Sequence, residues 1–427
     1  VFLASLYFVL PRVSGRSVKS EWLALVSLIA VVVAAASGAV LILAGLSDGR
    51  PYLEAPVFSE AVLLIGLILS TVVVTRTIAQ DAGQLVPAQW YVLASSWWAV
   101  LLVGFAMLPG LPGGIGAMQI GLFRAGLAGF WFAAAGVGFL YYLVPKLTGQ
   151  RSFEGSPFSA LGFWSLALAW AATGPVLYIY GPIPGWLQSV GVAFSIALFV
   201  PIALITRDLS ILMRGRARFI QDRITFSFAA AGTLFLVLIP VHNLVQALRS
   251  SSAVVGLTEW HRAGDLLLFG GAFTFWLFAL AYHATGAGRD RRRLGGWHLG
   301  LSFAGLSVAI GAMWIAGAAT GLSWAADVNT GEFTAVGVGW ELTDWVLEPF
   351  LAIRAGGTVL FALAQVLFII ALFVSSWQVS KADVEIDDEA FDLQLAGDGA
   401  SMSCPALRGG IVASFALVAI LTVFVPW

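Results

Sequence analysis

The sequence consists largely of long, uninterrupted runs of apolar residues. A helix needs about 20 apolar residues to cross the hydrocarbon core of a bilayer. Backbone groups left unpaired in that core are so costly that only helices and closed barrels span it. Because the runs are continuous and do not alternate with polar residues, they predict an all-α polytopic membrane protein. Eleven complete spans are predicted, at residues 21–46, 58–79, 88–110, 119–145, 157–180, 185–206, 224–248, 263–285, 296–321, 356–377 and 409–426.

The composition supports this fold class. Hydrophobic residues make up 59% of the chain and charged residues 11%, whereas soluble domains contain about 25% charged residues. The formal net charge of −1 argues against a nucleic-acid partner. The first residues, VFLASLYFVLPR, are apolar up to Pro11 and Arg12 and predict the closing half of one more helix. We therefore expect about twelve transmembrane helices, the first of them incomplete.

Lys and Arg residues predict the orientation, because short cytoplasmic loops keep an excess of positive charge. If the loop after Arg12 is cytoplasmic, most of the 22 Lys and Arg residues fall on that side of the membrane. The last helix then ends on the opposite side. The run GRDRRRLGG at residues 288–296 fits the same bias, and binding of a lipid headgroup is a second interpretation of it. His283 and His298 flank this run and are interpreted as interfacial polar residues.

Two segments depart from the pattern of apolar runs. Residues 321–350, rich in Trp and acidic side chains, predict a long outer loop. Residues 378–408 predict an acidic cytoplasmic linker, and residues 409–427 then form an extra transmembrane helix. The single cysteine, Cys404, lies in that linker, so the sequence offers neither a disulfide framework nor a CxxCH haem attachment site.

Several segments in order resemble the catalytic subunit I of the cbb-type (C-family) haem-copper oxidases. They include GFLYYLVPKLTG, TGPVLYIYGPIPGWLQSVGVAFSIALFVP, GWHLGLSFAGLSVAIGAMWIAGAATGLSW and AIRAGG. The resemblance covers residues 1–377 and implies a subunit I-like helical bundle in the bacterial inner membrane, with the last helix ending on the periplasmic side. Residues 409–427 resemble the anchor of the family's c-type cytochrome subunit.

The metal ligands of that family are missing from this sequence. The resemblance implies three copper-binding histidines at the positions of Ala125, Val176 and Leu177, and two haem-binding histidines at Gly264 and Leu266. Alanine, valine, leucine and glycine side chains carry no atom that donates an electron pair to copper or iron. The chain has four histidines in all, fewer than the family's haems and copper require together. We therefore expect no catalytic residue and no cofactor in this chain.

Two of the histidines could instead form an outer cluster. His242 lies at the outer end of one predicted helix and His261 at the outer start of the next. His261 and Asp265 are four residues apart and share a helix face. His242, His261 and Asp265 could together bind a metal such as zinc or calcium. The favoured interpretation is a hydrogen-bonded network at the outer rim.

The expected function is that of a non-catalytic, haem- and copper-free membrane scaffold subunit in a respiratory or electron-transfer complex. Its expected partners are membrane lipid, other membrane subunits and a c-type cytochrome. Two alternatives stay open. The first is an active cbb-type oxidase or nitric oxide reductase subunit with unusual ligands, which would bind haem b. The second is an ion or proton transporter subunit, although the predicted helices carry few ionisable groups at mid-membrane.

Overall fold

The fold is known from a computed structural model of the 427-residue chain. Within the residues that the structure describes, it contains helices, their connections and one isolated β-bridge between Arg50 and Leu53. Ten helical segments of that part of the chain are long and apolar enough to cross a membrane, which confirms the predicted all-α polytopic fold. The described residues are 2–50, 53–80, 85–108, 113–150, 153–216, 220, 222–329, 340–379, 411–413 and 415.

The predicted spans agree closely with these helices. A shorter apolar helix, Phe2–Ser14, corresponds to the helix predicted at the first residues. The predicted span at 409–426 lies almost entirely outside the described residues, as does the linker at 378–408. The chain divides into two compact units, each of which is considered by itself: Val1–Phe219 with Asp388–Trp427, and Ile220–Asp387.

The first unit is built around α4, whose side chains are buried along most of its length. Trp98 of this helix packs against Phe130 and Phe163, with ring centroids 4.8 and 5.7 Å away. Its indole nitrogen donates to the carbonyl oxygen of Ile411 at 3.1 Å, so the described part of the C-terminal segment belongs to this core. The helices of the unit are α1 (Phe2–Ser14), α2 (Glu21–Leu43), α3 (Val57–Ile78), α4 (Pro87–Ala106), α5 (Gly113–Gly126), η1 (Leu127–Ala133), α6 (Ala134–Leu147), α7 (Pro157–Ala171), η2 (Gly174–Tyr178), α8 (Gly185–Ala197) and α9 (Phe199–Met213).

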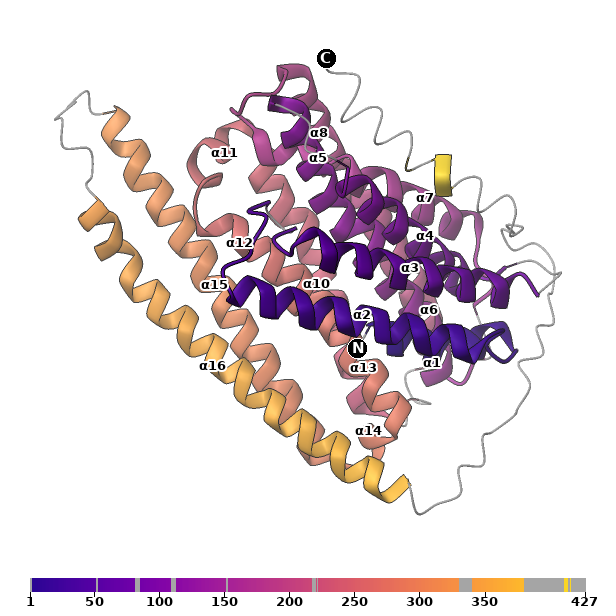
Figure 1. Cartoon of the computed structure of the whole chain (residues 1–427). Helices are drawn as coiled ribbons and strands as arrows, with labels where there is room; N and C mark the ends of the chain where they lie inside the picture. Colours follow the sequence, from indigo (N-terminus) through magenta and orange to yellow (C-terminus); the bar gives the residue numbers. More distant parts are fainter. Residues whose placement is uncertain are drawn as a thin grey trace. The chain divides into compact units, whose positions relative to one another are not determined.

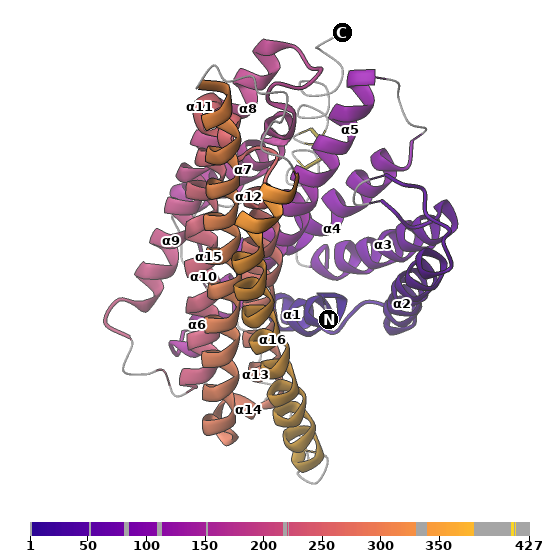
Figure 2. The same ribbon diagram turned by 90° about the vertical axis from the view of Figure 1, so that its left-hand side faces the viewer.

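Serine caps and small residues position these helices. Ser20 accepts a hydrogen bond from the backbone N–H of Leu23 and begins α2, because a side-chain oxygen there satisfies one of the free N–H groups of the first turn. α2 and α3 lie side by side (Figure 2), and Gly66 of α3 faces the side chain of Val31. A Cβ atom at Gly66 would stand 2.8 Å from that side chain, so glycine permits the close approach.

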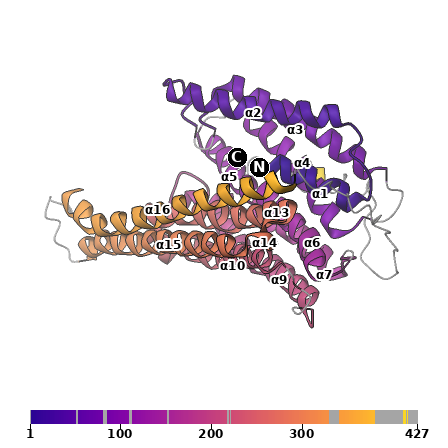
Figure 3. The same ribbon diagram turned by 90° about the horizontal axis from the view of Figure 1, so that it is seen from below.

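The second unit contains the longest helices of the described chain. α15 and α16 run side by side along most of their lengths (Figures 1 and 3). Gly305 and Gly357 meet between them: a Cβ atom on either glycine would stand 2.6 Å from the carbonyl oxygen of the other. The helices of this unit are α10 (Arg223–Ala247), α11 (Arg249–Val255), α12 (Glu259–Asp265), η4 (Leu266–Phe273), α13 (Thr274–Thr285), α14 (Ala287–Asp290), α15 (Arg292–Asn329) and α16 (Trp340–Val379).

The predicted outer loop at residues 321–350 is wrong over most of its length. α15 continues to Asn329, and α16 begins at Trp340. The indole nitrogen of Trp324 donates to the hydroxyl of Thr343 at 3.1 Å, so the two helices still contact each other in this region. The Trp-rich and acidic composition indicated a surface segment, but residues 321–329 and 340–350 are helical.

Candidate functional site

The corner that the sequence resemblance assigns to copper is the short 3₁₀ helix η2. Two glycines from neighbouring helices hold it closely. A Cβ atom at Gly121 of α5 would stand 3.1 Å from the carbonyl oxygen of Gly174. A Cβ atom at Gly191 of α8 would stand 3.0 Å from the backbone nitrogen of Val176. The backbone of this corner is therefore positioned by contacts that need no metal.

The three expected copper positions lie on adjoining elements of the first unit. Ala125 is buried near the end of α5, which packs against η2, and Val176 and Leu177 lie on η2 and are partly exposed. The structure thus brings the three positions onto neighbouring elements, as the resemblance implies. Their side chains are hydrocarbon only, so this donor set does not fit copper.

The expected haem positions lie in the second unit, where α12 ends and η4 begins. A Cβ atom at Gly264 would stand 2.4 Å from Nε2 of His242. The His242 ring therefore occupies the space into which a side chain at residue 264 would extend. Leu266, the second expected position, is the first residue of η4 and offers no donor atom. Neither Gly264 nor Leu266 has a side-chain atom that can bind haem iron.

Two tryptophans fix the ring of His242, which is 2% exposed. The indole nitrogen of Trp314 donates to His242 Nδ1 at 3.0 Å. The ring also stacks on Trp260, with centroids 5.6 Å apart and planes 8° from parallel. A hydrogen bond and stacking together hold the ring against Gly264, so the closed space at this glycine is part of the packed structure.

Both helices that should carry ligands contain a π-helical segment beside the expected position. η1 begins at Leu127, two residues after Ala125, and η4 begins at Leu266 itself. A π-helical turn holds an extra residue relative to an α-helix and occurs frequently at functional sites. No pattern in the sequence indicated these segments. They are a structural feature of the two candidate ligand helices that sequence reasoning missed.

The outer residues His242, His261 and Asp265 are not gathered into a metal site. His261 Nδ1 pairs with the amide nitrogen of Gln246, whereas His242 pairs with Trp314. Asp265 ends α12. Among the described residues, no group of three or more His, Cys, Asp and Glu side chains is placed to hold a metal ion. The contacts of the two histidines are those of a hydrogen-bonded network.

Glu259 is the first residue of α12, the helix that also contains His261 and Asp265, and it forms an ion-pair triad. Its carboxylate contacts Arg262 at 2.9 Å and Arg354 of α16 at 2.7 Å. The triad joins α12 to α16 through a glutamate that is 17% exposed. Arg354 lies 95 residues after Glu259, so no local pattern identified the contact between them.

Asp208 is a buried acid that the sequence reasoning also missed. It is 1% exposed and accepts hydrogen bonds from the hydroxyls of Ser159 at 2.5 Å and Tyr141 at 3.1 Å. Arg207 contacts its other oxygen at 3.0 Å. The predicted span ended at residue 206, which placed Asp208 in a loop. An acidic residue within a long apolar helix is the sequence signal that could have identified Asp208.

The side chain of His298 is 0% exposed, a burial that the sequence did not indicate. Its ring packs against Phe278 and Phe368 with centroids 4.7 and 5.0 Å away. Nδ1 lies 3.0 Å from the hydroxyl of Tyr282. α15 carries His298 into an aromatic cluster, although it lies only five positions after Arg293.

Residues 1–360 match the family described as cytochrome C and quinol oxidase polypeptide I. The chain is 23% identical over 415 residues to the cytochrome c oxidase subunit 1 homolog, bacteroid, of Bradyrhizobium diazoefficiens, covering 90% of this chain and 73% of that protein. It is 26% identical over 243 residues to the Cbb3-type cytochrome c oxidase subunit CcoN1 of Stutzerimonas stutzeri, covering 55% of this chain and 50% of that protein.

The relatives are distant, but the family match extends over most of the sequence and over both units of the structure. The helical architecture agrees with it, since the described residues supply ten candidate spans. The chain therefore belongs to the haem-copper oxidase subunit I family, described as cytochrome C and quinol oxidase polypeptide I.

Proposed function

We propose that this chain is a haem- and copper-free subunit I-like membrane scaffold of a respiratory or electron-transfer complex. The observation that carries the proposal is the closed space at Gly264, which His242 fills at 2.4 Å from the position of a Cβ atom. The absence of donor atoms at Ala125, Val176, Leu177 and Leu266 supports it further.

A scaffold role accounts for a family fold that is packed without its expected ligands. Glycine contacts hold the corner at η2, and two tryptophans hold His242. The partners proposed are membrane lipid, other membrane subunits and a c-type cytochrome, in a bacterial inner membrane. The relatives are named as cytochrome c oxidase subunits, and this supports a place for the chain in an assembly of that kind.

The test is the haem and metal content of the purified full chain. Pyridine-haemochrome absorbance measures b-type haem, and elemental analysis measures copper and iron. The expected result is far less than one equivalent of each. The Stutzerimonas stutzeri relative, produced in the same host and purified in the same detergent, is the control for cofactor supply. Stoichiometric haem in this chain would contradict the proposal and favour an active oxidase or nitric oxide reductase subunit with unusual ligands.

A proton-transporting role is a second candidate because of Asp208. A buried carboxylate with hydroxyl partners inside an apolar helix is typical of sites that hold or pass protons. The test is proton uptake by liposomes that contain the chain and carry a membrane potential. Uptake that is lost in Asp208→Asn, and retained in the exposed control Asp48→Asn, would favour transport. No uptake above empty liposomes would exclude it.

A further inference from the structure

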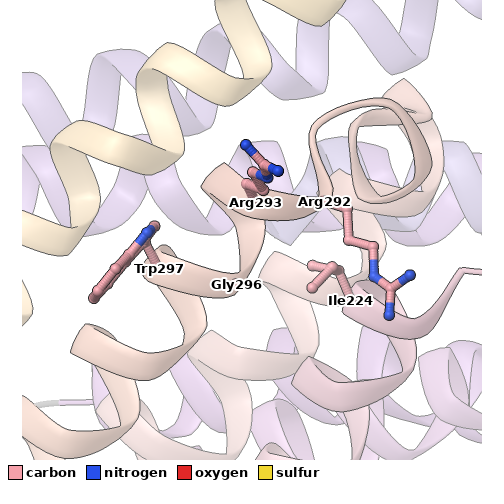
Figure 4. A pocket seen from close by; sticks show the side chains of 5 residues that line it. All are labelled: Ile224, Arg292, Arg293, Gly296 and Trp297. Carbon is pink, nitrogen blue, oxygen red and sulfur yellow. The ribbon is translucent and has the colours of Figure 1, made fainter.

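An open cavity of about 740 Å³ lies in the second unit, between the start of α15 and α10 (Figure 4). Gly295 packs against Ile224, since a Cβ atom at this glycine would stand 2.8 Å from that side chain. The next residue, Gly296, has no atom within 4 Å of the corresponding position. One glycine thus brings the two helices together, and its neighbour leaves the cavity open. The cavity is lined by Ile224, Arg292, Arg293, Gly296 and Trp297.

The two arginines of this cavity, Arg292 and Arg293, extend from the first turn of α15. Both side chains are exposed, and neither forms a hydrogen bond or ion pair within the part of the chain that the structure describes. In Figure 4, Arg292 extends toward Ile224, while Trp297 lies on the other side of Gly296. Asp222 of the neighbouring α10 cap is buried and accepts hydrogen bonds from Thr225, at 3.0 Å from its nitrogen and 2.5 Å from its hydroxyl.

The cavity lies at the level of the lipid headgroups, whichever way the chain is oriented. The candidate membrane span in α15 lies between Arg292 and Trp324, and its charged residues stand at the Arg292 end, where arginine and tryptophan side chains favour the boundary of the bilayer. Trp297 is 68% exposed, and tryptophan is enriched at that boundary, where its ring contacts lipid and its N–H remains a donor. A cationic cavity beside an exposed indole therefore faces both headgroups and the upper part of the acyl chains.

We propose that this cavity binds the phosphate of one anionic phospholipid. Guanidinium groups bind phosphate oxygens through paired N–H donors, and Arg292 and Arg293 supply two of them at one cavity. The apolar wall at Ile224 and the Trp297 ring contact the glycerol and acyl region. Basic pockets between transmembrane helices bind anionic headgroups in this way. The proposal is independent of whether the chain binds haem.

The test is native mass spectrometry of the delipidated full chain with added phosphatidylglycerol or phosphatidylcholine. One phosphatidylglycerol is expected to bind in preference to phosphatidylcholine. The pair Arg292→Gln and Arg293→Gln is expected to weaken phosphatidylglycerol binding about thirtyfold, because each arginine near an anionic headgroup contributes about fivefold. Gly296→Leu is expected to weaken it as well, since leucine fills the cavity without changing the charge.

A matched control removes two arginines elsewhere. Arg214→Gln with Arg216→Gln deletes the same charge from an exposed turn after α9 and is expected to keep wild-type binding. Equal weakening in this control would assign the effect to net charge and overturn the proposal. Wild-type binding by Gly296→Leu and by the arginine pair would also overturn it. Displacement of the lipid by inorganic phosphate at equal concentration would overturn it too, and would indicate a free-anion site.

Discussion

Gly264 and His242 show how a single contact determines what the expected haem position in the second unit can hold. The sequence resemblance predicted the missing ligand at Gly264, because that inference needs only a position and a residue type. It did not predict the ring that fills the space, since His242 lies on a different helix and its direction depends on Trp260 and Trp314. Side-chain direction of this kind is set by tertiary packing, which local patterns do not encode.

Gly264→Ala is expected to destabilise the chain by about 1–3 kcal/mol, because the added methyl group overlaps the His242 ring and forces it to move. Thermal unfolding of the purified chain in detergent measures the effect. Gly296→Ala is the control, since nothing lies within 4 Å of its added carbon. In the double variant with His242→Ala, the two losses should not add, because the methyl group no longer meets a ring. Full additivity would contradict the proposed contact.

At the scale of elements, the helices pack through features that the apolar runs do not reveal. The runs predicted where helices lie, but α15 and α16 approach each other through two glycine backbones, and η1 and η4 interrupt the α-helical hydrogen-bonding pattern. A run of apolar residues indicates burial in lipid or protein equally well. It therefore cannot identify which glycine is in contact and which one faces open space.

Gly357→Ala and Gly356→Ala provide a matched test of the contact between α15 and α16. The first places a methyl group 2.6 Å from the Gly305 carbonyl oxygen and should cost about 1–3 kcal/mol through overpacking. The second has open space and should be neutral or stabilise the helix by up to about 1 kcal/mol. Thermal unfolding distinguishes the neighbours. Equal destabilisation by both would show that the contact is not close.

Arg354→Gln should destabilise the contact between α12 and α16 by about 1–2 kcal/mol, because it leaves the mostly buried Glu259 with one exposed partner. Arg262 is the internal comparison, since its side chain is 70% exposed. Arg262→Gln should therefore cost about 0.5 kcal/mol or less. The midpoints of thermal unfolding at low and high salt give both values. If Arg262→Gln destabilised the chain more than Arg354→Gln, the pair of Glu259 with Arg262 would be the stronger of the two.

At the scale of the whole molecule, the number and order of the helices follow from length and hydropathy alone. Ten of the eleven predicted spans correspond to helices of the described residues, and the remaining one lies almost entirely outside them. The spans were predictable because each must be apolar over a fixed length. The ends of α15 and α16 were not, since helices can extend beyond the bilayer without any further apolar requirement.

Cys404 tests the predicted orientation of the whole chain. As the single cysteine, it gives an unambiguous labelling site in the predicted cytoplasmic linker. A membrane-impermeant maleimide should label it in inside-out vesicles and leave it unlabelled in right-side-out vesicles. Cys404→Ser is the control for background labelling. The opposite pattern would invert the topology that the distribution of Lys and Arg predicts.

The segment η1 determines where the helical run from Gly113 to Leu147 can accept a deletion. Gly121 and Gly138 lie on opposite sides of η1, and each faces a specific neighbour, Gly174 and Tyr91 respectively. Removing one residue from Leu127–Ala133 would restore α-helical geometry there and keep both halves in their positions, because a π-helical turn holds one extra residue. Removing one residue elsewhere in the run would instead rotate one half against the other by about 100°. Insertions and deletions in this helix are therefore constrained by register, as a change of reading frame is in a gene.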